Sequence, residues 1–120
     1  MHSDSENAVV HDGASLREAI VEMSAKGLSM VSVVDTNGYL CGILTDGDLR
    51  RMLEKGVDVY NEQVNNVMTK TPKTVDSREM AVNALEIMNS KNITSMPVLD
   101  ESKRVVGTIL VHDIIKAGIV

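Results

Sequence analysis

The chain contains an internal repeat, and this repeat limits the possible folds more than any other feature. When the sequence of 120 residues is shifted by 65 positions, its two halves align without a gap from Val10 and Val75 onward. Identical residues recur along this alignment, and the apolar pattern agrees between them, a combination that chance rarely produces. We therefore predict two copies of one small unit, residues 1–60 and 61–120.

The first copy has the pattern of a helix, two strands and a second helix. Apolar residues at helical spacing predict a helix that starts at Ser15, the first residue of a capping box, and stops at Gly27. Two β-rich runs at 30–34 and 39–44 flank a turn, and a short helix is expected at 46–54.

The second copy repeats this plan after a linker at residues 57–74. The linker is expected to include a short helix near 61–68. The sequence then predicts a helix capped by Asp76 or Ser77, strands near 95–99 and 104–110, and a last helix at 112–117. Neither unit is large enough to close its own core, so the copies are expected to pack together and to leave clefts between them.

Composition excludes several classes of partner. Aromatic residues make up 2% of the chain, Tyr39 and Tyr60 alone, so the core must be aliphatic and no stacking platform for single-stranded nucleic acid exists. A net charge of −5 argues against a phosphate backbone or an anionic membrane surface as partner. The single cysteine cannot form an internal disulfide, and no apolar run is as long as a membrane span. A cytoplasmic location is therefore expected.

The most informative segment runs from Gly42 to Arg51. A strand ends and a helix begins at Thr45, where unpaired backbone amides favour an anion. Asp48, one turn into the helix, can accept hydrogen bonds from two neighbouring hydroxyls such as those of ribose, and Arg50 and Arg51 can neutralise a phosphate. The same spacing also fits a simple capping box with solvated arginines. The pattern alone leaves both interpretations open.

The repeated unit resembles the cystathionine β-synthase (CBS) domain. The resemblance rests on Gly-x-x-Thr-x-x-Asp at the end of the first unit and on Met-Pro-Val, residues 96–98, and it covers essentially the whole chain. It implies an α+β fold, a CBS pair or Bateman module made of two β-α-β-β-α units related by pseudo-two-fold symmetry. Such pairs bind adenosine-containing or other nucleotides in central clefts and regulate an attached enzyme or transporter.

The resemblance also implies roles for individual residues. Asp48 would hold ribose hydroxyls and Thr45 a phosphate, whereas in the second unit Asp113 matches the aspartate but Leu110 replaces the Thr or Ser. Phosphate binding by the second cleft is therefore in doubt. The full set of expected ligand-binding residues is Ser29, Met30, Val31, Thr45, Asp46, Gly47, Asp48, Thr94, Ser95, Met96, Pro97, His112 and Asp113.

Four motifs are similar to the C-terminal CBS pair of arabinose 5-phosphate isomerases. They lie at residues 15–19, 22–28, 45–51 and 112–120. The resemblance implies a non-catalytic regulatory region of a longer sugar isomerase that serves lipopolysaccharide or capsule synthesis. The ligand would be AMP, ATP or CMP-Kdo, and the partners would be the isomerase domain and further copies of the chain. The alternative is a module that dimerises and assembles the enzyme without any ligand.

Other chemistry has little support in the sequence. Cys41 alternates with buried strand neighbours and is interpreted as a small core residue with no histidine partner. Asp46 and Asp48 lack the remaining ligands of a calcium loop. No acid–base pair suited to sugar-phosphate isomerisation is recognisable, so no catalytic residue, no required cofactor and no metal site are predicted.

Overall fold

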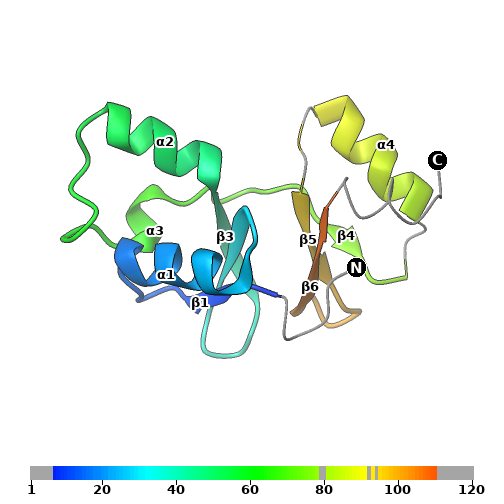
Figure 1. The fold of residues 1–120 in the computed structure, drawn as a ribbon. Helices are drawn as coiled ribbons and strands as arrows, with labels where there is room; N and C mark the ends of the chain where they lie inside the picture. The colour runs from blue at the N-terminus through cyan, green and yellow to red at the C-terminus, as the bar shows by residue number, and fades with distance from the viewer. Residues whose placement is uncertain (1–6, 79–80, 92, 94, 111–120) are drawn as a thin grey trace.

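The computed structural model describes residues 7–78, 81–91, 93 and 95–110. The first unit comprises five elements (Figure 1): β1 (Val9–His11), α1 (Leu16–Lys26), β2 (Met30–Val34), β3 (Leu40–Thr45) and α2 (Asp46–Glu54). A linker with the short helix α3 (Val64–Val67) leads to the second unit: β4 (Val75–Asp76), α4 (Ala81–Lys91), β5 (Ser95–Leu99) and β6 (Val105–Leu110). None of the helices in these ranges is long and apolar enough to cross a bilayer.

The strand registers show the repeat directly. Each unit forms a three-stranded sheet with its second strand in the middle, in the orders β1-β2-β3 and β4-β5-β6. Val33 pairs with Gly42 across the antiparallel β2–β3 ladder, and Val98 pairs with Gly107 at the positions 65 residues later. Both ladders also shift register immediately after this pair. The predicted duplication and the predicted α+β architecture of two similar units are therefore confirmed.

One predicted boundary is wrong. Asp76 or Ser77 was expected to cap α4, but Asp76 ends β4, and residues 77 and 78 form a turn before α4, which is described over Ala81–Lys91. The repeat explains the difference, because position 76 corresponds to His11 at the end of β1 rather than to the Ser15 cap. The Asp76 carboxylate instead accepts hydrogen bonds from the backbone and guanidinium of Arg78, which hold its pKa well below the usual range.

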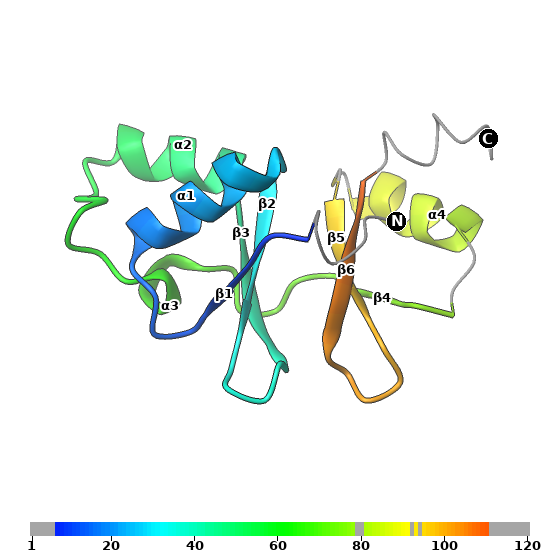
Figure 2. The same ribbon diagram turned by 60° about the horizontal axis from the view of Figure 1, so that its bottom comes forward.

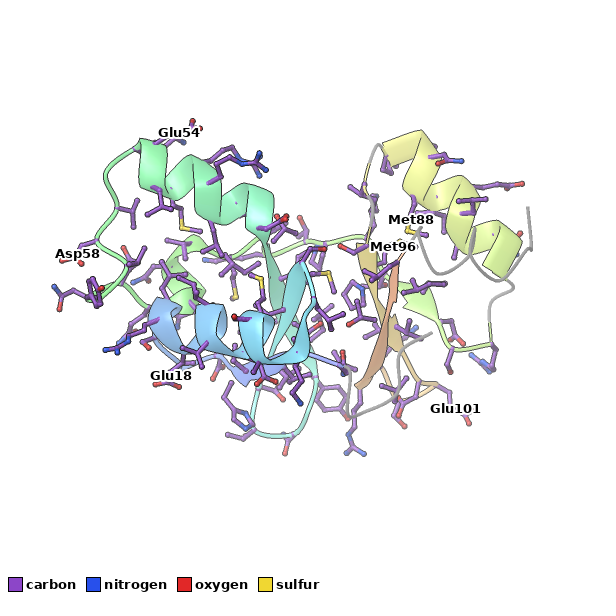
Figure 3. The ribbon with its side chains drawn as sticks, in the orientation of Figure 1. Glu18, Glu54, Asp58, Met88, Met96 and Glu101 are labelled. Carbon is purple, nitrogen blue, oxygen red and sulfur yellow. The ribbon has the colours of Figure 1, made fainter. Side chains whose placement is uncertain are left out.

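Each unit has its own aliphatic core between a helix and one face of its sheet. Met88 and Met96 lie together between α4 and β5 in the second core (Figure 3). Most of the described core residues of the second unit have a core counterpart 65 positions earlier in the first: Ala19 and Ala84, Met23 and Met88, Val31 and Met96, Val33 and Val98, Leu44 and Ile109. The short side chains of Ala19 and Ala84 let each helix approach its sheet closely.

The opposite faces of the two sheets are buried by the other unit. Met30 and Ser32 alternate with the core residues of β2, and Pro97 alternates with those of β5, yet all three are fully buried. The two sheets lie side by side in the middle of the molecule, with α1, α2 and α3 beyond one and α4 beyond the other (Figures 1 and 2). The Thr108 hydroxyl donates to the Asn7 side-chain carbonyl at 2.7 Å, a buried bond between the N-terminal segment and β6.

The hairpin turns of the two units are built alike, with one costly difference. Gly38 has φ 87° in the first turn, whereas the equivalent position of the second turn holds Lys103 with φ 70°. A residue other than glycine in this left-handed region lowers the stability of the fold by about 1 kcal/mol. We expect Lys103→Gly to raise the free energy of unfolding by up to about 1 kcal/mol, as measured by urea denaturation. An unchanged or lower midpoint would show that the Lys103 side chain offsets this cost.

Candidate functional site

A cleft of about 420 Å³ opens between the two units. The first unit contributes the end of β3 and the start of α2, the linker contributes one wall, and the second unit contributes Ile93 and the first residue of β5. The lining residues are Ser29, Ile43, Thr45, Asp46, Gly47, Asp48, Arg51, Thr69, Thr71, Pro72, Lys73, Ile93 and Ser95. Backbone amides, hydroxyls and charges of both signs therefore meet in one hollow.

The N-terminus of α2 is held by a complete capping box. Thr45 Oγ1 accepts from the Asp48 N–H at 3.1 Å, and Asp48 Oδ2 accepts from the Thr45 N–H at 3.0 Å. The Asp46 N–H donates to the Ser29 carbonyl at 3.0 Å. The N–H of Gly47 has no intrahelical acceptor by its position in the first turn, and Gly47 lines the cleft beside the Arg51 guanidinium, whose Nη1 would lie 3.5 Å from a Cβ built at this glycine. An anion can therefore approach this amide closely.

Asp48 keeps acceptor capacity despite these bonds. Its Oδ1 pairs with Arg51 Nη2 at 2.5 Å, so each carboxylate oxygen has one partner. A carboxylate offers about four acceptor positions, which leaves two for ligand hydroxyls. The predicted capping box is thus present, and it positions the carboxylate at the cleft instead of sealing it inside the protein, since the side chain is 19% exposed.

The charges that line the cleft balance. Arg51 and Lys73 face Asp46 and Asp48, in contrast to the net negative charge of the whole chain. Arg50, named with Arg51 from the sequence, is exposed and does not line the cleft. An anionic group can be neutralised here by Arg51 and Lys73.

Sequence reasoning missed the linker wall at residues 69–73. The linker reaches the cleft because Thr69 pairs with Ile43 at the outer edge of β3 through two backbone bonds of 3.0 and 2.8 Å. Gly42 permits this crossing, because a Cβ there would lie 2.6 Å from the Thr69 carbonyl oxygen. A second sequence signal for a linker free of the sheet lies at Pro97. Its repeat counterpart Ser32 donates its backbone N–H to the Ala8 carbonyl, whereas a proline has no N–H to donate. Lys73, the counterpart of Ala8, is not tied to the sheet by that bond.

The predicted ligand residues fall into three groups: those that line the cleft, those that are buried away from it, and those outside the described residues. The structure brings Ser29, Thr45, Asp46, Gly47, Asp48 and Ser95 to the cleft. Val31 and Met96 belong to the two aliphatic cores, and Met30 and Pro97 are buried away from the lining, because neighbouring strand residues face opposite sides of a sheet. Thr94, His112 and Asp113 are outside the described residues.

The described residues offer no second chemical centre. Burial and the nearby carboxylates of Asp12 and Asp35 raise the pKa of the Cys41 thiol, which disfavours the reactive thiolate. Within the described ranges, no three His, Cys, Asp or Glu side chains lie close enough to hold a metal ion. The arrangement is suited to binding a polar ligand.

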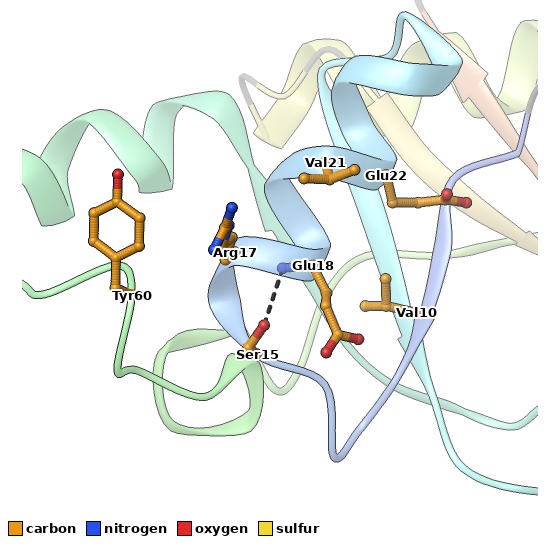
Figure 4. A pocket seen from close by; sticks show the side chains of 7 residues that line it. All are labelled: Val10, Ser15, Arg17, Glu18, Val21, Glu22 and Tyr60. Carbon is orange, nitrogen blue, oxygen red and sulfur yellow. Dashed lines mark hydrogen bonds between the residues drawn. The ribbon is translucent and has the colours of Figure 1, made fainter.

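A wider hollow of about 610 Å³ lies on the outer surface of α1 (Figure 4). Three of its polar side chains already have partners: Ser15 Oγ accepts from the Glu18 N–H at 3.1 Å, Glu22 accepts from the Val9 N–H at 3.2 Å, and Arg17 lies over the Tyr60 ring. We therefore assign the candidate site to the cleft between the units.

Comparison with known proteins agrees with this architecture. The family model described as "CBS domain" matches residues 3–55 and 64–119. Arabinose 5-phosphate isomerase KdsD of Pseudomonas aeruginosa is 45% identical over 107 residues, 89% of this chain and 33% of that protein. The enzyme of the same name from Escherichia coli K12 is 41% identical over 120 residues, 100% of this chain and 36% of that protein. The chain thus spans about a third of the length of these relatives.

Solved structures share the fold. The CBS domain pair of protein MJ0100, in complex with 5′-methylthioadenosine and S-adenosyl-L-methionine, superposes with a TM-score of 0.85 at 25% identity, covering 97% of this chain and 94% of that one. A CBS domain protein of Pyrobaculum aerophilum complexed with AMP gives a TM-score of 0.83 at 18% identity, covering 94% and 90%.

Proposed function

The chain belongs to the CBS domain family, and from that premise we propose that its central cleft binds a nucleotide or nucleotide-sugar. In this proposal residues 1–60 form the first unit and residues 61–120 the second, each supplying one side of the cleft. A CBS pair is a regulatory, non-catalytic module, so the ligand is an effector rather than a substrate. AMP, ATP and CMP-Kdo are the ligands that we put forward.

The observation that most directly supports this proposal is the arrangement of polar and charged groups at the start of α2. An unpaired Gly47 amide, the Thr45 hydroxyl and the Arg51 and Lys73 cations meet the needs of a phosphate, and the free acceptor positions of Asp48 meet those of ribose hydroxyls. Ile43 and Ile93 supply aliphatic surface for a base in a chain almost without aromatic rings. The adenosine-containing ligands of protein MJ0100 support this choice of ligand class.

The resemblance to arabinose 5-phosphate isomerases extends the proposal to a whole protein. We propose that this CBS pair regulates a sugar isomerase domain in the same polypeptide, in the synthesis of lipopolysaccharide or capsule. The effector can act only through different affinities for two states of that enzyme. CMP-Kdo would act as an end-product signal, and AMP or ATP as an energy signal.

Ligand binding is tested by thermal unfolding of the chain with AMP, ATP, CMP, CMP-Kdo and S-adenosylmethionine. A ligand at about 100 times its dissociation constant stabilises the folded state by about 2.7 kcal/mol, enough to raise the midpoint by several degrees. Asp48→Ala is expected to abolish the shift, measured against its own ligand-free midpoint because it also breaks the capping box. Arg50→Ala, on the same helix but outside the lining, is expected to retain it. No shift with any ligand at millimolar concentration would refute the proposal.

A second candidate function, ligand-free assembly, is favoured by exposed apolar side chains on the outside of the first unit. Val21 of α1 is 59% exposed and Leu53 of α2 is 63% exposed. Burial of such residues against a second copy would build a dimer without any ligand. Sedimentation of the ligand-free chain separates the two functions, because an assembly module dimerises without nucleotide and shows no thermal shift with it.

A further inference from the structure

The repeat implies a second cleft whose lining lies 65 positions away from that of the first. The structure shows that this second side of the pair differs in burial. Three residues of the open cleft have counterparts that are buried: Thr108 in place of Ile43, Asn7 in place of Pro72 and Met30 in place of Ser95. Thr108 and Met30 are fully buried, and Asn7 is 7% exposed. Positions that are open on one side of the pair are therefore closed on the other.

A buried hydrogen bond fastens the closed side. The Thr108 hydroxyl donates to the Asn7 side-chain carbonyl at 2.7 Å. The next residue, Ala8, is fully buried, and its carbonyl accepts from the Ser32 N–H at 2.9 Å. The segment before β1 is thus tied to β6 of the second unit and to β2 of the first (Figure 2). Water cannot replace the bond to Thr108 unless this segment lifts away, because both partners are buried.

The amino acid types explain why the first cleft stays open at the equivalent place. Ile43 and Pro72 have no side-chain donor or acceptor, so they cannot form the bond that joins their counterparts. Lys73, the counterpart of the fully buried Ala8, is exposed and lines the open cleft. On the closed side, Met30 also fills more space than a serine would.

We propose that the N-terminal segment seals the second cleft, with Asn7 as the plug, and that one CBS pair therefore binds one effector molecule. The number of effectors rests on the proposed nucleotide binding, whereas the seal itself does not. The bond to Thr108 also fixes the point where the chain enters the pair, since Asn7 is held against the second unit while β1 pairs within the first.

The test compares two matched cysteine variants by their rates of maleimide labelling, in a Cys41→Ala background that leaves one thiol in each chain. Ile43→Cys places this thiol in the open cleft, and Thr108→Cys places it at the repeat counterpart. We expect Thr108→Cys to react at least about 10-fold more slowly, because its thiol is reached only when the segment opens. Adding Asn7→Ala is expected to raise the Thr108→Cys rate toward that of Ile43→Cys. Asn37→Ala, the same substitution in an exposed turn, leaves it unchanged.

Calorimetry of the wild-type chain with AMP counts the effector molecules, and one AMP per chain is expected. Equal labelling rates for the two cysteine variants, or a Thr108→Cys rate that Asn7→Ala does not change, would overturn the seal. Two AMP molecules per chain would overturn it as well. If the chain binds none of the nucleotides while Thr108→Cys remains protected, the proposed function fails and the seal stands.

Discussion

Replacing Gly42 with alanine is expected to lower the free energy of unfolding by about 3 kcal/mol, a drop of roughly 10 °C in the midpoint. The added Cβ would lie 2.6 Å from the Thr69 carbonyl oxygen and 2.8 Å from the Met68 sulfur. A flexible methionine can move away, but the carbonyl belongs to backbone that pairs with Ile43 at 3.0 and 2.8 Å. The linker must therefore leave β3, and the cleft wall at Thr69 moves with it.

Gly13→Ala is the matched control for this substitution. No atom lies within 4 Å of a Cβ built at Gly13, and its backbone is not in the left-handed region. We expect its stability to change by less than about 0.5 kcal/mol. Circular dichroism melts of the two variants give the comparison. If Gly42→Ala melts with the wild type, the linker does not depend on its pairing with β3.

Much of this fold could be predicted because the same pattern of residues occurs twice in the sequence. A structure predicted for one unit had to fit the other unit as well, and Val33 and Val98 do occupy matching places in their sheets. The strands β1 and β4 gave no clear signal of their own, because three and two residues are too few to show an alternating pattern. The prediction for α4 failed where Asp76 and Ser77 offered capping side chains at the wrong place in the repeat.

The candidate site could be predicted only where its residues are close together in the sequence. Thr45 and Asp48 share a helix start, so their spacing carries the information. Lys73 and Thr71 reach the cleft through a linker crossing that only the backbone of Gly42 permits, and no local pattern shows which segment crosses a given glycine. The local order of residues therefore predicted the side of the cleft that the first unit forms. The linker wall could not be predicted in this way, because its position depends on tertiary packing.

Replacing Leu44 with alanine is expected to destabilise both units, although Leu44 belongs to the core of the first unit alone. Leu44 is fully buried, so the lost contacts and the remaining cavity cost about 3 kcal/mol. Leu53→Ala removes the same atoms from a side chain that is 63% exposed, and it is expected to cost less than about 0.5 kcal/mol.

We expect the loss of stability to reach the second unit, because each sheet buries one face of the other. Ser32 and Thr108 are fully buried yet belong to neither aliphatic core, because they lie on the sheet faces opposite to those cores, and unfolding of one unit would expose the other. Amides of β5 and β6 are therefore expected to exchange about 100-fold faster in Leu44→Ala, as amides of β2 and β3 do, in hydrogen-exchange NMR. Exchange that accelerates in β2 and β3 alone would show two units that unfold independently. A ligand in the cleft would then stabilise each unit separately, whereas one cooperative transition lets an effector bound at α2 stabilise the whole pair.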